Sequence, residues 1–419
     1  MNKSNPIKSK IPVKVVYLIS VFVVGFLFQR ILFSYPMVSR KLINSYYNAK
    51  QLNSKKSFSV KSSDAKKLNY IWVKVTDDST IPPRDGAAAV VHDGQMYLIG
   101  GWNAYEAERF PRKTVNDVWR SNDGKTWVQV KSNSFSSSFS SLNNDWEGRH
   151  CFGCFSFLGY IYIICGDLNQ GYYQDDIWRS KDGNRWEKVI AGAELDWRPR
   201  HNFMMAVAQD KMFVIGGQTS QNFYSASSNN QHTSTAFHSD VWSTVDGRKW
   251  VKVKNLGETW NPRGMVLGNC IFNNRIILVG GSIGISDIPW LDCNGKSFLF
   301  QDTVFESQPL DRIISDGGLV FVKKPQKVPL KLGWTFAQEF DSKFWLVGGF
   351  DEDLKDQSKI IFSKDLQSWT QLSDCPFPPA HAMSVFNYND SLIFLCGSSL
   401  TTEVWQLEKA SATAPLLSP

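Results

Sequence analysis

The chain has 419 residues, of which 14% are aromatic and 20% charged, and its formal net charge is +7. Of its 46 Lys and Arg residues, 13 lie within residues 1–69 beside a single acid, Asp64, so the remaining residues hold 33 basic and 38 acidic groups. A mildly acidic body lacks the basic face that phosphate contacts require, which excludes nucleic acid as a partner.

A short N-terminal tail, residues 1–10, precedes an apolar stretch over residues 11–33. If Lys14 and Arg30 extend towards the interfaces, this stretch reaches the length that a transmembrane helix needs. No small-residue cleavage site follows, so we expect an uncleaved signal anchor, with a removed signal peptide as the alternative. Residues 34–69 are rich in Lys, Ser and Asn and are expected to form a flexible stem.

The charges beside the apolar stretch predict its orientation. Four Lys residues lie before or near its N-terminal end, and three basic residues lie near or after its C-terminal end, so the positive-inside rule favours a cytoplasmic N-terminus. They are Lys3, Lys8, Lys10 and Lys14 on one side and Arg30, Arg40 and Lys41 on the other. We therefore expect a single-pass, type II membrane protein whose body is lumenal or extracellular. Asn389-Asp390-Ser391 is a glycosylation sequon in that body and is compatible with this orientation.

An apolar run that ends in a Gly-Gly or Cys-Gly pair occurs six times. The pairs are Gly100-Gly101, Cys165-Gly166, Gly216-Gly217, Gly280-Gly281, Gly348-Gly349 and Cys396-Gly397. Repetition of a small unit at intervals of about fifty residues or more is typical of a β-propeller, in which each unit forms one blade.

Most pairs are followed by two short predicted strands around a tight turn. The clear copies cover residues 117–130, 176–189 and 240–253, and the weaker copies cover 311–324 and 360–372. In most copies Asp-Gly supplies the positive φ that the turn needs. Leu366 replaces the glycine in the last copy, so we expect that turn to differ.

The last unit has EVWQL (403–407) but no strand after it, and residues 409–419 are expected to be a disordered tail. The segment YIWVKV (70–75) resembles the outer strands of the other units. Because an unpaired edge strand is costly, we predict that residues 70–75 close the sixth blade. The predicted fold is an all-β, six-bladed propeller over residues 70–408.

These features resemble kelch repeats, in the broad group that contains the central domain of galactose oxidase. The turns at Ser121, Ser180 and Thr244 are similar to the Asp-boxes of sialidases, although one residue shorter. The resemblance covers residues 70–408, and it implies a fold but not a function, because kelch propellers serve enzymes and scaffolds alike.

In a four-stranded blade, the loops after the second and fourth strands lie on one face. Here those loops are long: 102–115, 131–149, 218–238 and 282–310. We call this side the long-loop face and the opposite side the short-turn face. Binding residues concentrate on loops, so we expect a partner to bind the long-loop face around the central channel.

An arginine precedes the innermost predicted strand in four blades. These arginines are Arg84, Arg149, Arg200 and Arg263. The residues that follow the first three are Asp85, His150 and His201, while Trp334 and His381 are assigned to the matching positions of blades five and six. Such groups around a channel mouth suit an anionic or sugar-like ligand. The favoured alternative is structural, with each guanidinium bonding carbonyl groups of the adjacent blade.

No cofactor or metal is predicted, because His150, His201 and His381 lack an acid or cysteine at metal-ligand spacing. Trp290 and Leu291 belong to an apolar loop that either packs over the propeller or contacts a partner. No catalytic residues can be assigned. The favoured function is a membrane-anchored module that binds a protein or glycan; the alternative is a lumenal carbohydrate-active enzyme, either sialidase-like or a sugar epimerase.

Overall fold

The computed structural model describes most of the chain from residue 68 onwards. The described residues are 68–103, 114–134, 145–166, 172–191, 194–219, 223–225, 231–232, 236–284, 298–312, 317–353, 355–372, 375–395 and 397–410. The predicted anchor (11–33) and all but the end of the stem (34–69) therefore lie outside the described residues. Within the described ranges, no helix is long and apolar enough to cross a membrane.

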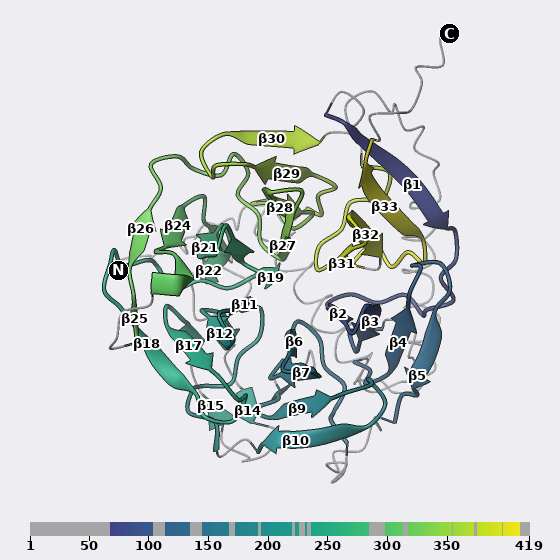
Figure 1. Ribbon diagram of the computed structural model, residues 1–419, viewed down its shortest axis with the longest axis horizontal. Coiled ribbons are helices and arrows are strands. Elements are labelled where there is room, and N and C mark those ends of the chain that lie inside the picture. Colours follow the sequence, from purple (N-terminus) through teal and green to yellow (C-terminus); the bar gives the residue numbers. More distant parts are fainter. Residues whose placement is uncertain are drawn as a thin grey trace, which may run out of the picture. The chain divides into compact units, whose positions relative to one another are not determined.

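Six small sheets surround a common axis (Figure 1). Blade one contains β2 (Ala88–His92), β3 (Gln95–Ile99), β4 (Val118–Ser121) and β5 (Val128–Lys131). Blade two contains β6 (Gly153–Phe157), β7 (Tyr160–Ile164), β9 (Ile177–Ser180) and β10 (Trp186–Ile190). Blade three contains β11 (Met204–Ala208), β12 (Lys211–Ile215), β17 (Val241–Thr244) and β18 (Val251–Asn255).

The other three blades follow in chain order. The sheet of blade four contains β20 (Ile271–Phe272), β21 (Arg275–Val279), β24 (Val304–Ser307) and β26 (Phe321–Lys323). Strand β19 (Val266–Gly268) precedes β20 along the chain and pairs in parallel with β27 (Thr335–Phe340) of blade five. Blade five contains β27 (Thr335–Phe340), β28 (Lys343–Val347), β29 (Ile360–Ser363) and β30 (Trp369–Leu372). Blade six contains β31 (Ser384–Tyr388), β32 (Ser391–Leu395), β33 (Val404–Lys409) and β1 (Tyr70–Thr76). The prediction of a six-bladed, all-β propeller is confirmed.

The ring is closed by a strand from its N-terminal end, as predicted. Strand β1 pairs antiparallel with β33, and Trp72 lies opposite Leu407. The Tyr70 hydroxyl donates a hydrogen bond to Asp341 in blade five at 2.6 Å, so this strand also contacts the preceding blade. Figure 1 shows β1 on the outside of blade six.

Blade four differs from the prediction. Residues 311–324 were expected to form its third and fourth strands, but the third strand is β24, which begins at Val304. Residues 302–307 (DTVFES) match the NDVWRS pattern of blade one, but Phe305 replaces the tryptophan. Without that tryptophan the segment was not recognised as a copy of the repeat. A short 3-10 helix, η3 (Leu310–Arg312), follows, and only Phe321–Lys323 pair as the outer strand.

The turn that contains Leu366 also differs from the prediction. It was expected to depart from the others, yet Leu366 has φ of 61° and donates its N–H to the Ser363 hydroxyl at 2.8 Å. Gly183 makes the same bond to Ser180 in blade two, at 2.9 Å and with φ of 76°. The leucine side chain is buried, and this apolar burial offsets the cost of about 1–2 kcal/mol for a left-handed non-glycine residue.

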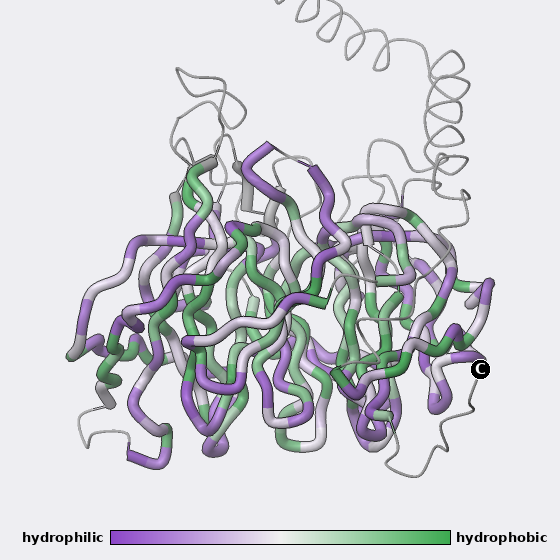
Figure 2. Tube along the Cα trace, turned by 90° about the horizontal axis from the view of Figure 1, so that it is seen from above, coloured by the Kyte–Doolittle hydropathy of each residue, from purple (hydrophilic) through white to green (hydrophobic). Residues whose placement is uncertain are grey.

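Apolar side chains fill the wedges between blades. One buried cluster, for example, combines Met96 and Trp127 of blade one with Phe386 and Ile393 of blade six. Figure 2 shows hydrophobic strands through the body of the ring and hydrophilic turns along one of its edges. The repeated tryptophans thus contribute to packing between and within blades.

Short additional strands extend the ring. They are β8 (Tyr172–Tyr173), β13 (Gln218–Thr219), β14 (Phe223–Ser225), β15 (Gln231–His232), β16 (Ala236–Phe237), β22 (Ser282–Gly284), β23 (Phe298–Phe300) and β25 (Gly318–Leu319). Strand β25 pairs parallel with β18 on the outside of blade three. Strands β13 and β16, and β22 and β23, form hairpin-like pairs within the two longest loops of the long-loop face.

Candidate functional site

One backbone contact repeats at all six blade junctions and defines equivalent positions. The second glycine of each pair donates its N–H to the carbonyl of a residue just ahead of the next innermost strand, at 2.8–3.3 Å. The accepting residues are Arg84, Arg149, Arg200, Arg263, Leu332 and Ala380. We call this position the arginine slot. Blades one to four fill it with arginine, and blades five and six do not.

The four arginine side chains lie inside the blades. Their exposed fractions are 0–1%, so the expectation that they ring an open channel mouth is wrong. Arg84, for example, donates to the Gly100 carbonyl at 2.9 Å and forms a bidentate ion pair with Asp117, with N–O distances of 2.5 and 3.0 Å. These partners belong to the arginine's own blade, whereas the structural alternative had placed them in the adjacent one.

The other arginines show the same arrangement with one variation. Arg149 pairs with Asp176 at 2.9 Å and Arg200 with Asp240 at 2.6 Å. The fourth, Arg263, donates instead to the Thr303 hydroxyl at 3.0 Å. Its burial lowers the pKa of the Arg263 guanidinium to about 10. A buried charge without a direct carboxylate partner is costly. The charge of the buried guanidinium is therefore compensated least well in blade four.

A collar of backbone hydrogen bonds surrounds the axis at the long-loop face. Its six members lie two residues after the arginine slot, and their φ angles run from 49° to 68°. They are Gly86, Cys151, Asn202, Met265, Trp334 and Ala382. Five amide-to-carbonyl bonds of 2.8–3.1 Å join neighbouring members. All members except Trp334 are buried.

The collar corrects the assignment of Trp334. It was expected to occupy the position that follows the arginine slot, but Gly333 is there, bridged to Phe350 as Asp85 is bridged to Trp102. Trp334 lies one position later, in the collar itself. His381 does occupy the predicted position, because it directly follows Ala380.

Three aromatic rings meet at the arginine-free part of the long-loop face. The centroid of the His381 ring lies 4.8 Å from that of Phe350 and 5.8 Å from that of Trp334, and the Phe350 and Trp334 centroids are 5.7 Å apart. All three side chains are half-buried. We call these residues the ring cluster. The structure thus brings together two residues predicted from sequence, Trp334 and His381.

A carboxylate fixes the orientation of the histidine in the ring cluster. Asp356 Oδ1 accepts a hydrogen bond from His381 Nδ1 at 2.6 Å, and Asp356 Oδ2 accepts one from the Ser398 hydroxyl at 2.8 Å. The proton therefore resides on Nδ1, and Nε2 has no hydrogen-bond partner among the described residues. The arrangement presents one polar atom beside two aromatic surfaces.

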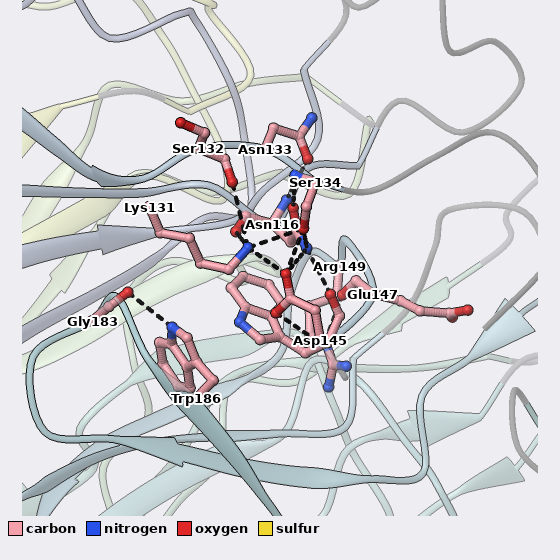
Figure 3. A network of polar contacts seen from close by, with 11 residues as sticks. Asn116, Lys131, Ser132, Asn133, Ser134, Asp145, Glu147, Arg149, Gly183 and Trp186 are labelled. Atoms are coloured by element: carbon pink, nitrogen blue, oxygen red, sulfur yellow. Dashed lines mark hydrogen bonds and ion pairs between the residues drawn. The ribbon is translucent and has the colours of Figure 1, made fainter. Parts of the chain in front are cut away.

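A buried network anchors the loop that joins blades one and two (Figure 3). Lys131 Nζ donates to the Asn116 carbonyl at 3.0 Å, pairs with Asp145 at 2.8 Å and lies 5.3 Å from the Trp146 ring centroid. Burial lowers the pKa of Lys131. The Lys131–Asp145 ion pair joins the two described ends of the loop, and the Asn116 amide ties one of them to blade one by donating to the Trp146 carbonyl at 2.7 Å. Since these polar groups bond one another, we interpret the network as structural.

The remaining predicted residues are Asp85, His150 and His201. Asp85 and His150 are half-buried on the long-loop face, and His201 is buried with Nδ1 at 3.3 Å from the Asn202 amide nitrogen. Across the described ranges, no group of three His, Cys, Asp or Glu residues could hold a metal ion. Trp290 and Leu291 lie outside the described residues.

Sequence reasoning did not identify Phe350, Asp356 or Ser398. Phe350 follows the Gly348-Gly349 pair directly, in the position that Trp102 holds in blade one, so a stricter alignment of the repeats identifies it. Asp356 has no repeat equivalent that would single it out, because it lies in the variable segment after the pair.

Comparison with known proteins supports the fold. A model of the Kelch motif matches residues 83–133, which span blade one from the arginine slot to the end of β5. No curated protein matches the chain. The chain is therefore a six-bladed β-propeller with a kelch motif, an architecture that typically serves as a binding module.

Proposed function

We propose that this propeller is a binding module that holds a protein or glycan on its long-loop face at the ring cluster. The observation that carries the proposal is the contact of Trp334, Phe350 and His381, beside a carboxylate that orients the imidazole. Aromatic surfaces pack against the apolar faces of sugars or against apolar side chains. His381 Nε2 would then accept a hydrogen bond from a ligand hydroxyl or amide.

A glycan-array screen of the full chain in detergent micelles tests this proposal. We expect binding to a defined set of glycans. Only a sugar that places a hydroxyl group at His381 Nε2 while its apolar face contacts the Trp334 and Phe350 rings would make both contacts. Absence of binding to every glycan would exclude the glycan form of the proposal and leave the protein form. Chemical crosslinking on intact cells would then test the protein form, and absence of any crosslinked partner would contradict it.

The carbohydrate-active enzyme remains a second candidate because Asp356 orients His381 as it would orient an acid–base catalyst. The sialidase-like version needs arginines that converge on a ligand, and the buried, separately paired arginines argue against it. The epimerase version predicts that a bound sugar changes on incubation. If nuclear magnetic resonance showed that sugars identified on the array are unchanged after incubation with the protein, the epimerase version would be contradicted.

In the same proposal, residues 11–33 anchor the chain in a membrane, residues 34–69 form a stem and the propeller faces a lumenal or extracellular space. The support is the apolar stretch and its flanking charges. Asn389 is exposed in the turn between β31 and β32, where a glycosyltransferase has access to it.

The glycosylation state of Asn389 tests this orientation. We expect the protein from eukaryotic cells to lose apparent mass on treatment with peptide N-glycosidase, and Asn389→Gln to remove that change. Asn387→Gln, an exposed asparagine outside the sequon, is the matched control. Identical mobility of the treated and untreated wild type would contradict a lumenal or extracellular propeller.

A further inference from the structure

The innermost strands of all six blades line a central cavity of about 210 Å3. The cavity lies on the short-turn side of the collar. Residues near the collar, such as Met205 and Phe336, are 6–9% exposed, whereas Val207 and Gln338, further along the same strands, are half-buried, and Asn387 is exposed. The cavity therefore opens towards the short-turn face, away from the ring cluster.

The lining has an apolar part and a polar part. The apolar part includes Val90, Met205, Phe336 and Val385, and the polar part consists of Ser156, Asn269, Gln338 and Asn387. Asn269 is bridged to Met205 and so lies at the same depth, where the two parts meet. No lining residue is charged. An ion would lose its hydration without gaining a partner, so the chemistry of the lining selects an uncharged molecule.

Hydrogen-bond donors in the polar part are directed into the protein. The side-chain amides of Gln338 and Asn387 both donate to the Glu339 carbonyl, at 3.2 and 2.8 Å. His92 Nε2 lies 3.2 Å from the Lys181 carbonyl, so it carries the proton of the neutral ring, and Nδ1 accepts the Ser156 hydroxyl at 2.9 Å. The side-chain oxygens of Ser156, Gln338 and Asn387 are thus available as acceptors, beside one further N–H on each of the two amides.

Asn269 provides an independent indication of a ligand. Its Oδ1 is buried and has no hydrogen-bond partner in the part of the chain that the structure describes, and the residue lines the cavity. A buried acceptor is normally satisfied by protein, water or ligand. A hydroxyl or N–H group in the cavity would satisfy it.

We propose that this cavity is a second binding site, which takes a small, uncharged molecule with hydroxyl or N–H donors on an apolar frame. Its volume is below that of a pocket for a drug-sized ligand, about 300–1,000 Å3, so a frame of one six-membered ring fits best. The donors would face Ser156 and Asn269, and the frame would contact the apolar part.

Saturation-transfer nuclear magnetic resonance on the full chain in detergent micelles tests this site, with trans-1,2-cyclohexanediol as the probe. We expect the diol to bind and its dimethyl ether, which has no donors, to bind more weakly. Ser156→Ala removes one acceptor with little change in shape and should weaken diol binding about threefold. Val207 is half-buried near the opening of the cavity, so Val207→Phe should fill the opening and abolish binding.

Empty micelles and the Val207→Phe variant measure probe uptake by the detergent, and the thermal midpoint of each variant confirms that it folds. Equal binding of the diol and its ether, or diol binding that Val207→Phe leaves unchanged, would overturn the proposal. So would absence of diol binding to the folded wild type.

Discussion

Blades one to four and blades five and six use the arginine slot in different ways. In the first group, a fully buried guanidinium joins the slot to a backbone carbonyl and, in blades one to three, to an aspartate at the start of the third strand. In the second group, the slot holds the buried apolar side chains of Leu332 and Ala380, and the slot carbonyls still accept the glycine N–H. The ring cluster is found at these two blades.

The difference separates the part of the repeat that maintains the fold from the part that is available for binding. In blades one to three the arginine forms an internal ion pair, and in blade four it donates to a threonine hydroxyl and backbone carbonyls, so none of the four guanidinium groups is accessible to a ligand. In blades five and six, Asp356 and His381 instead form a half-buried pair beside Trp334 and Phe350. In a repeat protein, departures from the repeat are therefore a better guide to the binding site than its most regular residues.

The largest expected effect comes from removing one arginine. Arg84→Met leaves the Asp117 carboxylate, which is only 5% exposed, without its guanidinium, and should cost about 3–5 kcal/mol in the free energy of unfolding. Leu332→Met changes the same slot in blade five with little change in volume and should cost less than about 1.5 kcal/mol. Urea unfolding measures both, and equal losses would contradict the distinction between the two groups of blades.

His238 in blade three is expected to make a smaller, pH-dependent contribution to the free energy of unfolding. Burial, followed by the charge of Arg200, lowers the pKa of His238 to about 3. Because the folded form binds fewer protons than the unfolded form below pH 6.5, stability should fall as the pH decreases from 6.5 towards 3. The loss from this residue should reach about 2 kcal/mol at pH 5.

His238→Gln cannot titrate and should lose less stability between pH 7 and pH 5 than the wild type. The variant also keeps a group able to donate to the Thr219 hydroxyl, which lies 3.1 Å from His238 Nε2. Urea unfolding at the two pH values measures the difference. Parallel pH profiles of variant and wild type would show that His238 is protonated equally in both states.

The smallest expected effect is a difference in the free energy of unfolding between two variants of the turn in blade five. Leu366→Gly and Leu366→Ala both remove a side chain from the buried cluster that also contains Ile277, so both should be less stable than the wild type. The glycine variant should be more stable than the alanine variant by about 1 kcal/mol, because φ is 61° at this position. A glycine variant more stable than the wild type would show that leucine packing does not offset the backbone cost.

Much of the fold was predictable from sequence because regular features carry it. The glycine pairs, the Asp-Gly turns and residues 70–75 gave the number of blades and the strand that closes the ring. The third strand of blade four was missed because Phe305 replaces the tryptophan that marks it elsewhere. The turn at Leu366 was missed because packing against neighbouring residues compensates for unfavourable local backbone geometry.

Less of the candidate site was predictable. His381 and Trp334 were identified from their place in the repeat, although Trp334 was placed one position too early. The arginines were predictable as repeated residues, but whether a guanidinium faces a ligand or its own blade depends on side-chain direction. Asp356 was not identified at all, since it lies in the variable segment after the glycine pair and contacts His381, which is 25 positions further along the sequence.

The most direct test of the central claim compares two residues of the collar in one binding measurement. Trp334 belongs to the ring cluster, and Cys151 holds the equivalent position in blade two. On the same glycan array, Trp334→Ala should reduce binding at least about tenfold, a typical loss for an aromatic anchor, while Cys151→Ala should retain it. Full binding by Trp334→Ala, or an equal loss in both folded variants, would contradict a binding site in the arginine-free blades.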